Sequence, residues 1–278
     1  MIWQFIMNVD LHCHTTASDG SLSPSELLQL AEQRNISMLS ITDHDTLDAY
    51  SQIDQLDLPL RLIPGIEFSS KWRKIGVHIV GLNIDLQHPT IIAGAALQTK
   101  TRRDRAEKIA EKLAGMGFKN TLDAARARAL GGQIGRPHFA EHLVAIGAVK
   151  SSQQAFKKYL GAGKIADIKA CWEDIETVTG WIKAAGGTAV LAHPSKYGLT
   201  RAKLTALIGD FKDAGGEAME VISGQQTSAL TVDLASLSVK HQLLASCGSD
   251  FHRHHTPWAA LGRVAELPDN CIKIWSRW

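Results

Sequence analysis

The sequence predicts an α/β protein with a mainly parallel sheet or barrel and a helical segment inserted into it. Short runs of β-branched and other apolar residues alternate with helical patterns along most of the chain, as repeated βα units require. Between residues 100 and 165, helical periodicity instead continues with no convincing strand. We therefore expect an α/β framework formed by residues 1–99 and 166–278, and a helical insertion formed by residues 100–165.

Seven segments have the length and composition of β-strands. They are IWQFIMNVDL at 2–11, MLSIT at 38–42, LRLIPGIEF at 60–68, VHIVGLNI at 77–84, TAVLA at 188–192, AMEVI at 218–222 and LLAS at 243–246. The first crossover helix has a clear beginning, because Ser23 can cap it, Pro24 suits the first helical position and Glu26 completes a capping box. Further helical patterns cover 89–115, 121–130, 137–147 and 151–160.

The composition limits what the protein can be. With 278 residues, 45% of them hydrophobic, the chain can bury a substantial core. A formal net charge of +2 excludes the broadly basic field of a non-specific nucleic-acid binder, so an anionic substrate must be held locally. Four cysteines without CxxC spacing suit reduced thiols. Without a signal-peptide pattern or an apolar run of about 20 residues, we expect a soluble cytoplasmic protein with no membrane contact and no obligate protein partner.

Histidine and carboxylate side chains stand at the ends of nearly every expected strand. Because the carboxyl ends of strands converge on one face in barrel-like α/β folds, such residues would meet there. Imidazole and carboxylate groups suit Mn²⁺, Fe²⁺ or Zn²⁺ better than Mg²⁺ or Ca²⁺, and so many ligands indicate two or three ions. The residues concerned are His12, His14, Asp43, His44, Glu67, His78 (within its strand), His193, Asp250 and His252.

Each of these residues also has an ordinary structural explanation. An HxH pair such as His12 and His14, taken alone, is as consistent with ordinary polar residues as with metal ligands. Asp43 could cap a helix. Glu67 could be a solvated residue at the end of a strand. A histidine within an apolar strand, such as His78, is often a core residue whose ring nitrogens are hydrogen-bonded. These explanations do not account for the recurrence of ligand-type residues at one strand end after another.

Six motifs resemble those of the PHP (polymerase and histidinol phosphatase) phosphoesterases. They are DLHCHTTASDGSLSP at 10–24, ITDHDT at 41–46, LIPGIEFS at 62–69, HIVGLNID at 78–85, AVLAHP at 189–194 and SCGSDFH at 246–252. The helical insertion is similar to that of a subgroup containing ribonuclease AM and the 3′,5′-nucleoside bisphosphate phosphatases. The similar segments there are TRRDRAEKIAEKL at 101–113, GRPHFAEHL at 135–143 and FKKYLGAGK at 156–164.

This resemblance implies a distorted (β/α)7 barrel with an inserted helical subdomain, and a site for three divalent ions, Mn²⁺ above Fe²⁺ or Zn²⁺. By motif position, the first ion is held by His12, His14, Glu67 and Asp250, the second by Glu67, His78 and His193, and the third by Asp19, His44 and His252. Asp43 would orient a ligand, with a direct role also open. The expected catalytic residues are Asp19, Asp43, His44, Glu67 and His252.

Several basic residues of the insertion are candidates for substrate binding. Arg102 and Arg105 lie three apart on one helix face and could grip a second phosphate, although alone they would suit a solvated basic face. Arg136 and His138 begin another expected helix, where a phosphate would meet free backbone N–H groups. With the resemblance, the expected substrate contacts are Asp19, Arg102, Arg105, Arg136, His138 and Lys164.

Two stretches depart from the family pattern, namely IADIKACW at 165–172 and RHHTPW at 253–258, so the roles of His254 and His255 are left open.

The resemblance implies a hydrolase that removes the 3′-phosphate of 3′,5′-bisphosphonucleotides such as pAp. The same chemistry would trim short 5′-phosphorylated RNA from its 5′ end, giving nucleoside 5′-monophosphates. The alternatives are a small-metabolite phosphatase of the histidinol-phosphatase type and a metal-binding PHP module without catalysis.

Overall fold

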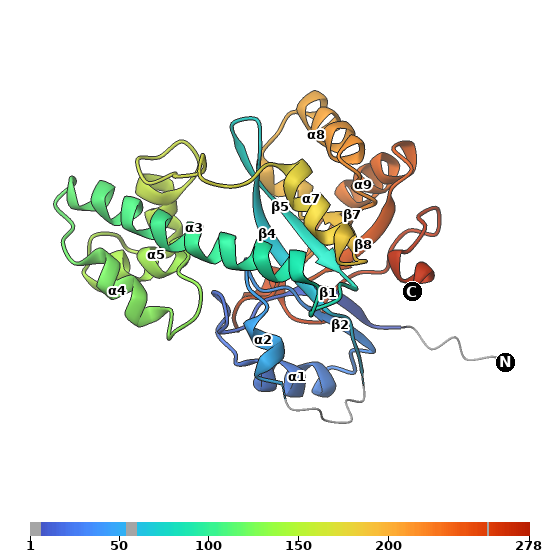
Figure 1. Cartoon of the computed structure of the whole chain (residues 1–278), viewed down its shortest axis with the longest axis horizontal. Helices are drawn as coiled ribbons and strands as arrows, with labels where there is room; N and C mark the ends of the chain where they lie inside the picture. The colour runs from blue at the N-terminus through green and yellow to red at the C-terminus, as the bar shows by residue number, and fades with distance from the viewer. Residues whose placement is uncertain (1–6, 54–59, 255) are drawn as a thin grey trace.

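The computed structural model describes residues 7–53, 60–254 and 256–278, and these residues form eight strands in two sheets (Figure 1). The first sheet has the order β1-β2-β3 and is parallel, and the second has the order β4-β5-β6-β7-β8. The strands are β1 (Val9–Cys13), β2 (Met38–Ile41), β3 (Arg61–Leu62), β4 (Gly65–Trp72), β5 (Ile75–Leu82), β6 (Thr188–Leu191), β7 (Ala218–Ser223) and β8 (Leu244–Gly248).

The helices begin and end close to the positions that the sequence indicates. In the first of them the predicted capping box is present, because the Glu26 N–H donates to Ser23 Oγ at 3.3 Å and the Ser23 N–H donates to Glu26 Oε2 at 2.8 Å. The helices are α1 (Pro24–Gln33), α2 (Asp48–Ser51), α3 (Pro89–Ala114), α4 (Thr121–Arg128), α5 (Arg136–Ala145), α6 (Ser152–Ala155), α7 (Ile175–Ala184), α8 (Arg201–Asp213) and α9 (Ser228–Lys240).

Four of the six strand pairings among the described residues are parallel, as expected, and the two pairings of β5 are the exceptions. β4 and β5 form an antiparallel hairpin, β5 also pairs antiparallel with β6, and parallel pairing resumes from β6 to β8. The continuous strand expected at 60–68 is wrong, since the chain divides there into β3 and β4 around Pro64, which has no N–H for the ladder. The α/β class is confirmed, and the finer assignment as a distorted (β/α)7 barrel stays a prediction.

The expected first strand at 2–11 is only partly described. Residues 1–6 lie outside the described residues, and the strand begins at Val9. The two sheets meet where β1 passes the end of β8, because Cys13 forms an isolated parallel bridge with Phe251 and the Asp250 N–H donates to His12 O at 2.8 Å. A second isolated bridge, between His44 and Glu67, joins the end of β2 to β4. The strand ends therefore gather at one place.

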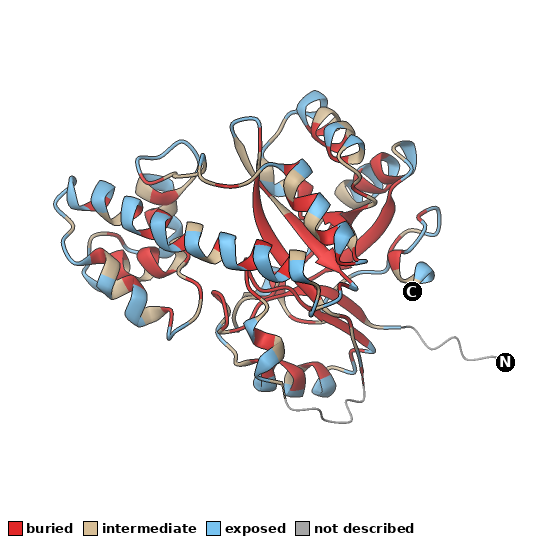
Figure 2. Cartoon of the chain, in the orientation of Figure 1, coloured by how far each residue is buried: buried red, intermediate tan, exposed pale blue. Residues whose placement is uncertain are grey.

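Helices α3 to α6 and the π-helical turn Phe156–Leu160 gather beside the sheets (Figure 1). They share a hydrophobic core of their own, which includes Ile109, Phe139 and Leu143. Figure 2 shows buried residues concentrated in the strands and on the inner faces of the helices. The expected boundary at residue 100 falls inside the continuous helix α3, and the division into domains stays a prediction.

Within the described part of the chain, none of the helices combines the length and the apolar character needed to cross a bilayer.

The close approach of β1 to β8 depends on Gly248. A Cβ at this position would lie 2.3 Å from His12 Cβ and 2.7 Å from His12 N, so the backbone would have to move. We expect G248A to lower the free energy of unfolding by about 1–3 kcal/mol through overpacking, as measured by urea denaturation. G180A is the matched control, since a Cβ there, in α7, meets nothing within 4 Å. Equal stability of the two variants would contradict the predicted crowding.

Candidate active site

Glu67, on β4, is a fully buried carboxylate at the centre of a group of histidines. Its Oε1 lies 2.9 Å from His78 Nδ1 and 2.9 Å from His193 Nε2, and its Oε2 lies 2.8 Å from His44 Nδ1. These histidines come from β5, from the end of β6 and from the segment after β2. One side chain therefore links three separate parts of the fold.

A second group lies on the β1 side of Glu67. His12 Nε2 is 3.3 Å from Glu67 Oε1, and His14 Nε2 is 3.4 Å from Glu67 Oε2. Asp250 Oδ1 lies 3.6 Å from His12 Nε2 and 3.3 Å from His14 Nε2. The two imidazoles of the HxH motif thus face the same side, with their Nε2 atoms 3.2 Å apart.

The third group surrounds Asp19, in the loop after β1. Asp19 Oδ1 lies 3.3 Å from His252 Nε2 and 3.9 Å from His44 Nε2. Ligand atoms of His14, Asp19, His44 and His252 all lie within 4.8 Å of one another. The structure therefore brings together the nine residues that were expected to bind metal, which the sequence scatters between positions 12 and 252.

Charge pairing within the cluster offsets the cost of burial. Burial alone would raise the pKa of Glu67, but His78 and His12 hold this pKa well below its usual range. In the same way, His252 holds the pKa of Asp19 well below its usual range. Burial disfavours a protonated His252, yet the Asp19 carboxylate raises the pKa of this histidine to about 9. The cluster is therefore held by interactions between ligand-type groups.

Several buried atoms of the cluster have no hydrogen-bond partner among the described residues, including Asp19 Oδ1, Glu67 Oε2, His14 Nδ1 and His193 Nδ1. Glu67 Oε2 pairs with His44 Nδ1 by distance, but without hydrogen-bond geometry. A buried polar atom left in this state costs roughly 1–3 kcal/mol, so such positions call for a further partner. Close groups of imidazole and carboxylate donors are what Mn²⁺, Fe²⁺ and Zn²⁺ prefer, and the residues fit divalent ions.

Glu220, on β7, orients two of these residues and was not identified from the sequence. Its Oε1 lies 2.5 Å from His12 Nδ1, and its Oε2 accepts a hydrogen bond from the His193 N–H at 2.6 Å. A carboxylate on the outer nitrogen of a ligating histidine fixes the ring and raises its basicity. The signal that could have identified Glu220 is its place as a carboxylate inside the apolar run AMEVI.

Asp43 lies behind the cluster. Its carboxylate accepts hydrogen bonds from the Thr15 N–H at 2.7 Å, from Thr15 Oγ1 at 2.6 Å and from Ser18 Oγ at 2.5 Å. These contacts hold the loop that carries Asp19. They agree with an orienting function for Asp43 and give no support to its direct participation in catalysis.

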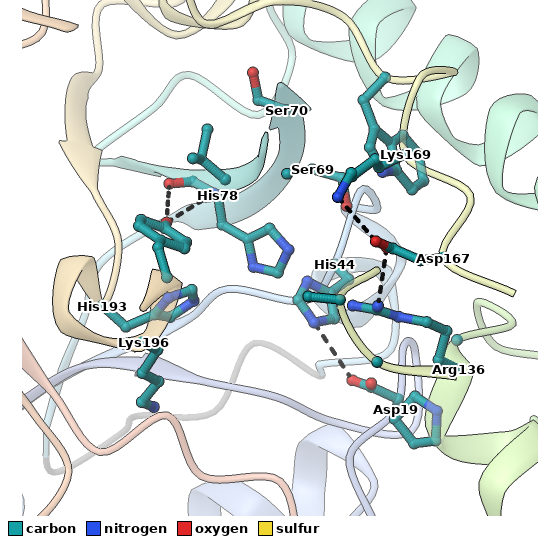
Figure 3. A pocket seen from close by; sticks show the side chains of 18 of the residues that line it. Asp19, His44, Ser69, Ser70, His78, Arg136, Asp167, Lys169, His193 and Lys196 are labelled. Atoms are coloured by element: carbon teal, nitrogen blue, oxygen red, sulfur yellow. Dashed lines mark hydrogen bonds and ion pairs between the residues drawn. The ribbon is translucent and has the colours of Figure 1, made fainter. Parts of the chain in front are cut away.

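The cluster opens onto a pocket of about 630 Å³. Figure 3 shows Lys196 beside His193 on one side of the pocket, and Arg136, Asp167 and Lys169 on the other. Among the described residues, five Arg and Lys side chains line the pocket, namely Arg102, Arg105, Arg136, Lys169 and Lys196. The pocket is therefore suited to an anion that extends from the cluster toward the helical unit.

Arg102 and Arg105 reach this pocket from the middle of α3, and both are buried. Arg102 Nε donates to Asp45 Oδ2 at 2.7 Å, which fixes the position of its guanidinium. The two guanidiniums lie 5.5 and 5.2 Å from the ring centroid of Trp172. Burial, together with Arg136 and Arg102, lowers the pKa of Arg105 to about 9. A bound anion would relieve this crowding of cations.

Two residues that were predicted to contact the substrate, His138 and Lys164, are not part of the pocket lining. His138 does not line the pocket, and its Nδ1 accepts a hydrogen bond from the Gly135 N–H at 3.0 Å. The structure thus gives His138 a capping function at the start of α5 in place of the predicted substrate contact. Lys164 also lies outside the pocket lining, on an exposed part of the loop that follows the π-helical turn. The predicted contact between Lys164 and the substrate stays a prediction.

Sequence reasoning missed several lining residues. Asp167, Lys169 and Trp172 belong to the stretch that departs from the family pattern, and no periodic signal marks them. Lys196 also lines the pocket, and its Nζ donates to Asp250 Oδ2 at 2.5 Å. Of the two histidines whose roles were left open, His254 contacts Phe251 and residue 255 lies outside the described residues.

A family model and several known proteins match this chain in sequence. The PHP domain family matches residues 10–122. The 5′-3′ exoribonuclease Rnm of Escherichia coli is 43% identical over 97% of this chain and 93% of its own length. The 3′,5′-nucleoside bisphosphate phosphatase of Chromobacterium violaceum is 37% identical over 96% of this chain and 95% of its own length.

Two solved structures agree with these relatives. An amidohydrolase from Chromobacterium violaceum, with bound sulfate and no metal, has a TM-score of 0.88 at 36% identity and covers 97% of this chain and 95% of its own. A structure from Bifidobacterium adolescentis described as a metal-dependent phosphoesterase has a TM-score of 0.78 at 26% identity and covers 98% of this chain and 94% of its own. Fold and site together define the class of metal-dependent phosphoesterases. This chain belongs to the PHP-domain family.

Replacing Glu220 with glutamine should lower the affinity for Mn²⁺ about 10- to 100-fold, because a neutral amide no longer supports His12. The measurement is a calorimetric titration of Mn²⁺ into protein stripped with a chelator. E266Q, which makes the same change on an exposed loop, should bind Mn²⁺ like the wild type. Unchanged affinity in a folded E220Q variant would disprove the orienting function.

Proposed function

We propose that the protein hydrolyses the 3′-phosphate of 3′,5′-bisphosphonucleotides such as pAp, and that it also acts as a 5′-3′ exoribonuclease on short 5′-phosphorylated RNA. Both reactions break the bond between phosphorus and a 3′-oxygen, and both release a nucleoside 5′-monophosphate. The observation that carries the proposal is the pocket itself, which joins the ligand cluster to a separate group of arginines. The activities named for the two curated relatives support it.

Three divalent ions fit the distribution of ligand-type residues, with Mn²⁺ as the expected ion and Fe²⁺ or Zn²⁺ as alternatives. His12, His14, Glu67 and Asp250 would hold the first ion, Glu67, His78 and His193 the second, and Asp19, His44 and His252 the third. When bound, such ions act as Lewis acids toward phosphoryl oxygens and lower the pKa of water into the neutral range.

The arginines select the end of the substrate. A terminal phosphomonoester carries about two negative charges, whereas an internal phosphodiester carries one, so Arg102, Arg105 and Arg136 favour a 5′ end over the interior of an RNA chain. Trp172 and Phe156 lie against these guanidiniums and restrict their movement. Holding the 5′-phosphate there places the 3′-phosphorus of the same nucleotide toward the cluster. Substrate positioning of this kind accounts for both activities.

The test replaces Arg136, whose guanidinium lines the pocket and donates to Leu160 O at 3.0 Å. We expect R136A to reduce kcat/KM for pAp about 10- to 100-fold, because a charge-assisted contact to the 5′-phosphate is lost. Hydrolysis of adenosine 3′-phosphate, which lacks that group, should change little. Steady-state phosphate release from both substrates measures the difference.

R126A, which removes an exposed arginine from α4, is the control and should leave both rates unchanged. If R136A lost activity equally on the two substrates, Arg136 would not bind the 5′-phosphate and the assignment of that end of the pocket would be wrong.

A further inference from the structure

A carboxylate, Asp167, stands in the wall of a pocket that is otherwise built for anions. Its side chain is 8% exposed, and it lies in the segment between the π-helical turn and α7. Asp167 Oδ2 accepts hydrogen bonds from the Gly163 N–H at 2.7 Å and from Lys169 Nζ at 2.8 Å, and Asp167 Oδ1 lies 3.7 Å from Arg136 Nη1 (Figure 3). Hydrolysis at the ligand cluster has no evident use for this group.

Asp167 is charged at neutral pH. Burial alone would raise its pKa, but hydrogen bonds from Lys169 and from the Gly163 N–H lower this pKa below its usual value. The carboxylate therefore remains an anion beside Arg136 whether or not a substrate is bound. It competes with a bound phosphate for that guanidinium, and it repels any further negative charge brought into the same space.

The formal charges on this side of the pocket match one kind of ligand. We call the group formed by Arg102, Arg105, Arg136, Lys169 and Asp167 the arginine compartment. Its four cations are opposed by Asp167 and by Asp45, the buried partner of Arg102, which leaves a formal charge of +2. A phosphomonoester carries about −2, so the two are balanced. A triphosphate brings two further anionic phosphoryl groups that nothing in the compartment neutralises.

We propose that Asp167 makes the arginine compartment selective for a 5′-monophosphate over a 5′-triphosphate, and that it limits the affinity for the nucleoside 5′-monophosphate product. This inference rests on the proposed function. Because the side chains of Asp167, Arg102 and Arg105 are buried, salt screens the repulsion at Asp167 only weakly, and we expect this single carboxylate to discriminate. Weaker binding of the product favours its release between successive cleavages of an RNA chain.

The test compares two trinucleotides of the same sequence, one with a 5′-monophosphate and one with a 5′-triphosphate, using the full chain loaded with Mn²⁺. D167N should raise the ratio of kcat/KM for the triphosphate to that for the monophosphate by about five- to tenfold. The inhibition constant of AMP, measured with pAp as substrate, should fall by a similar factor. D167E, which keeps the charge, should behave like the wild type in both measurements.

K169M separates the effect of charge from a general loosening of the segment. Both D167N and K169M break the Asp167–Lys169 pair, but they change the charge of the compartment in opposite directions. K169M should therefore weaken AMP inhibition where D167N strengthens it. D104N removes a half-exposed carboxylate on the surface of α3 and should leave the ratio and the AMP inhibition unchanged.

The proposal is overturned if D167N leaves the ratio within about twofold of the wild type, or if D167N and K169M shift AMP inhibition in the same direction. An unchanged ratio in an active enzyme would reject the assignment of Asp167 alone. A wild-type protein that hydrolyses neither pAp nor 5′-phosphorylated RNA would reject the proposed function, and this inference with it.

Discussion

The complete burial of Glu67 is the constraint on which the rest of the site depends. A carboxylate without solvent is stable only where opposite charges or metal ions compensate for its lost hydration. Here the compensation comes from histidines on several elements, and the antiparallel β4–β5 hairpin supplies one of them by placing His78 beside Glu67. The strand ends must therefore meet closely, which also explains why β1 passes β8 at the position of Gly248.

The helical unit adds the second half of the site. The beginning of helix α3 packs on α7, where Gly94 lies against Trp181, and the end of α3 enters the helical core. The middle of α3 therefore carries Arg102 and Arg105 across the pocket. Phosphate chemistry at the cluster would by itself accept many phosphate esters. In the proposed function, the arginines lie at a distance from the cluster and restrict the substrate to one that carries a second phosphate on the same nucleotide.

The sequence indicated much of this arrangement, because ligand-type residues at strand ends converge in any fold of this class. It did not indicate the β4–β5 hairpin, since apolar periodicity does not distinguish parallel from antiparallel pairing. Glu220 was missed because its function depends on the orientation of the His12 ring. A helix N-terminus suits both capping and phosphate binding, and for His138 the contacts favour capping. The proposed role of Asp167 depends on its proximity to Arg136, which only the folded chain shows.

The central claim is that one metal cluster and one group of arginines act together on a nucleotide with two phosphates. The most direct test measures kcat/KM for pAp, adenosine 3′-phosphate and histidinol phosphate, with metal-stripped protein and after reconstitution with Mn²⁺. The account predicts activity only after reconstitution, with pAp preferred by at least about 100-fold, since the other two lack a 5′-phosphate on a nucleotide. Comparable rates on the three substrates, or full activity without metal, would contradict it.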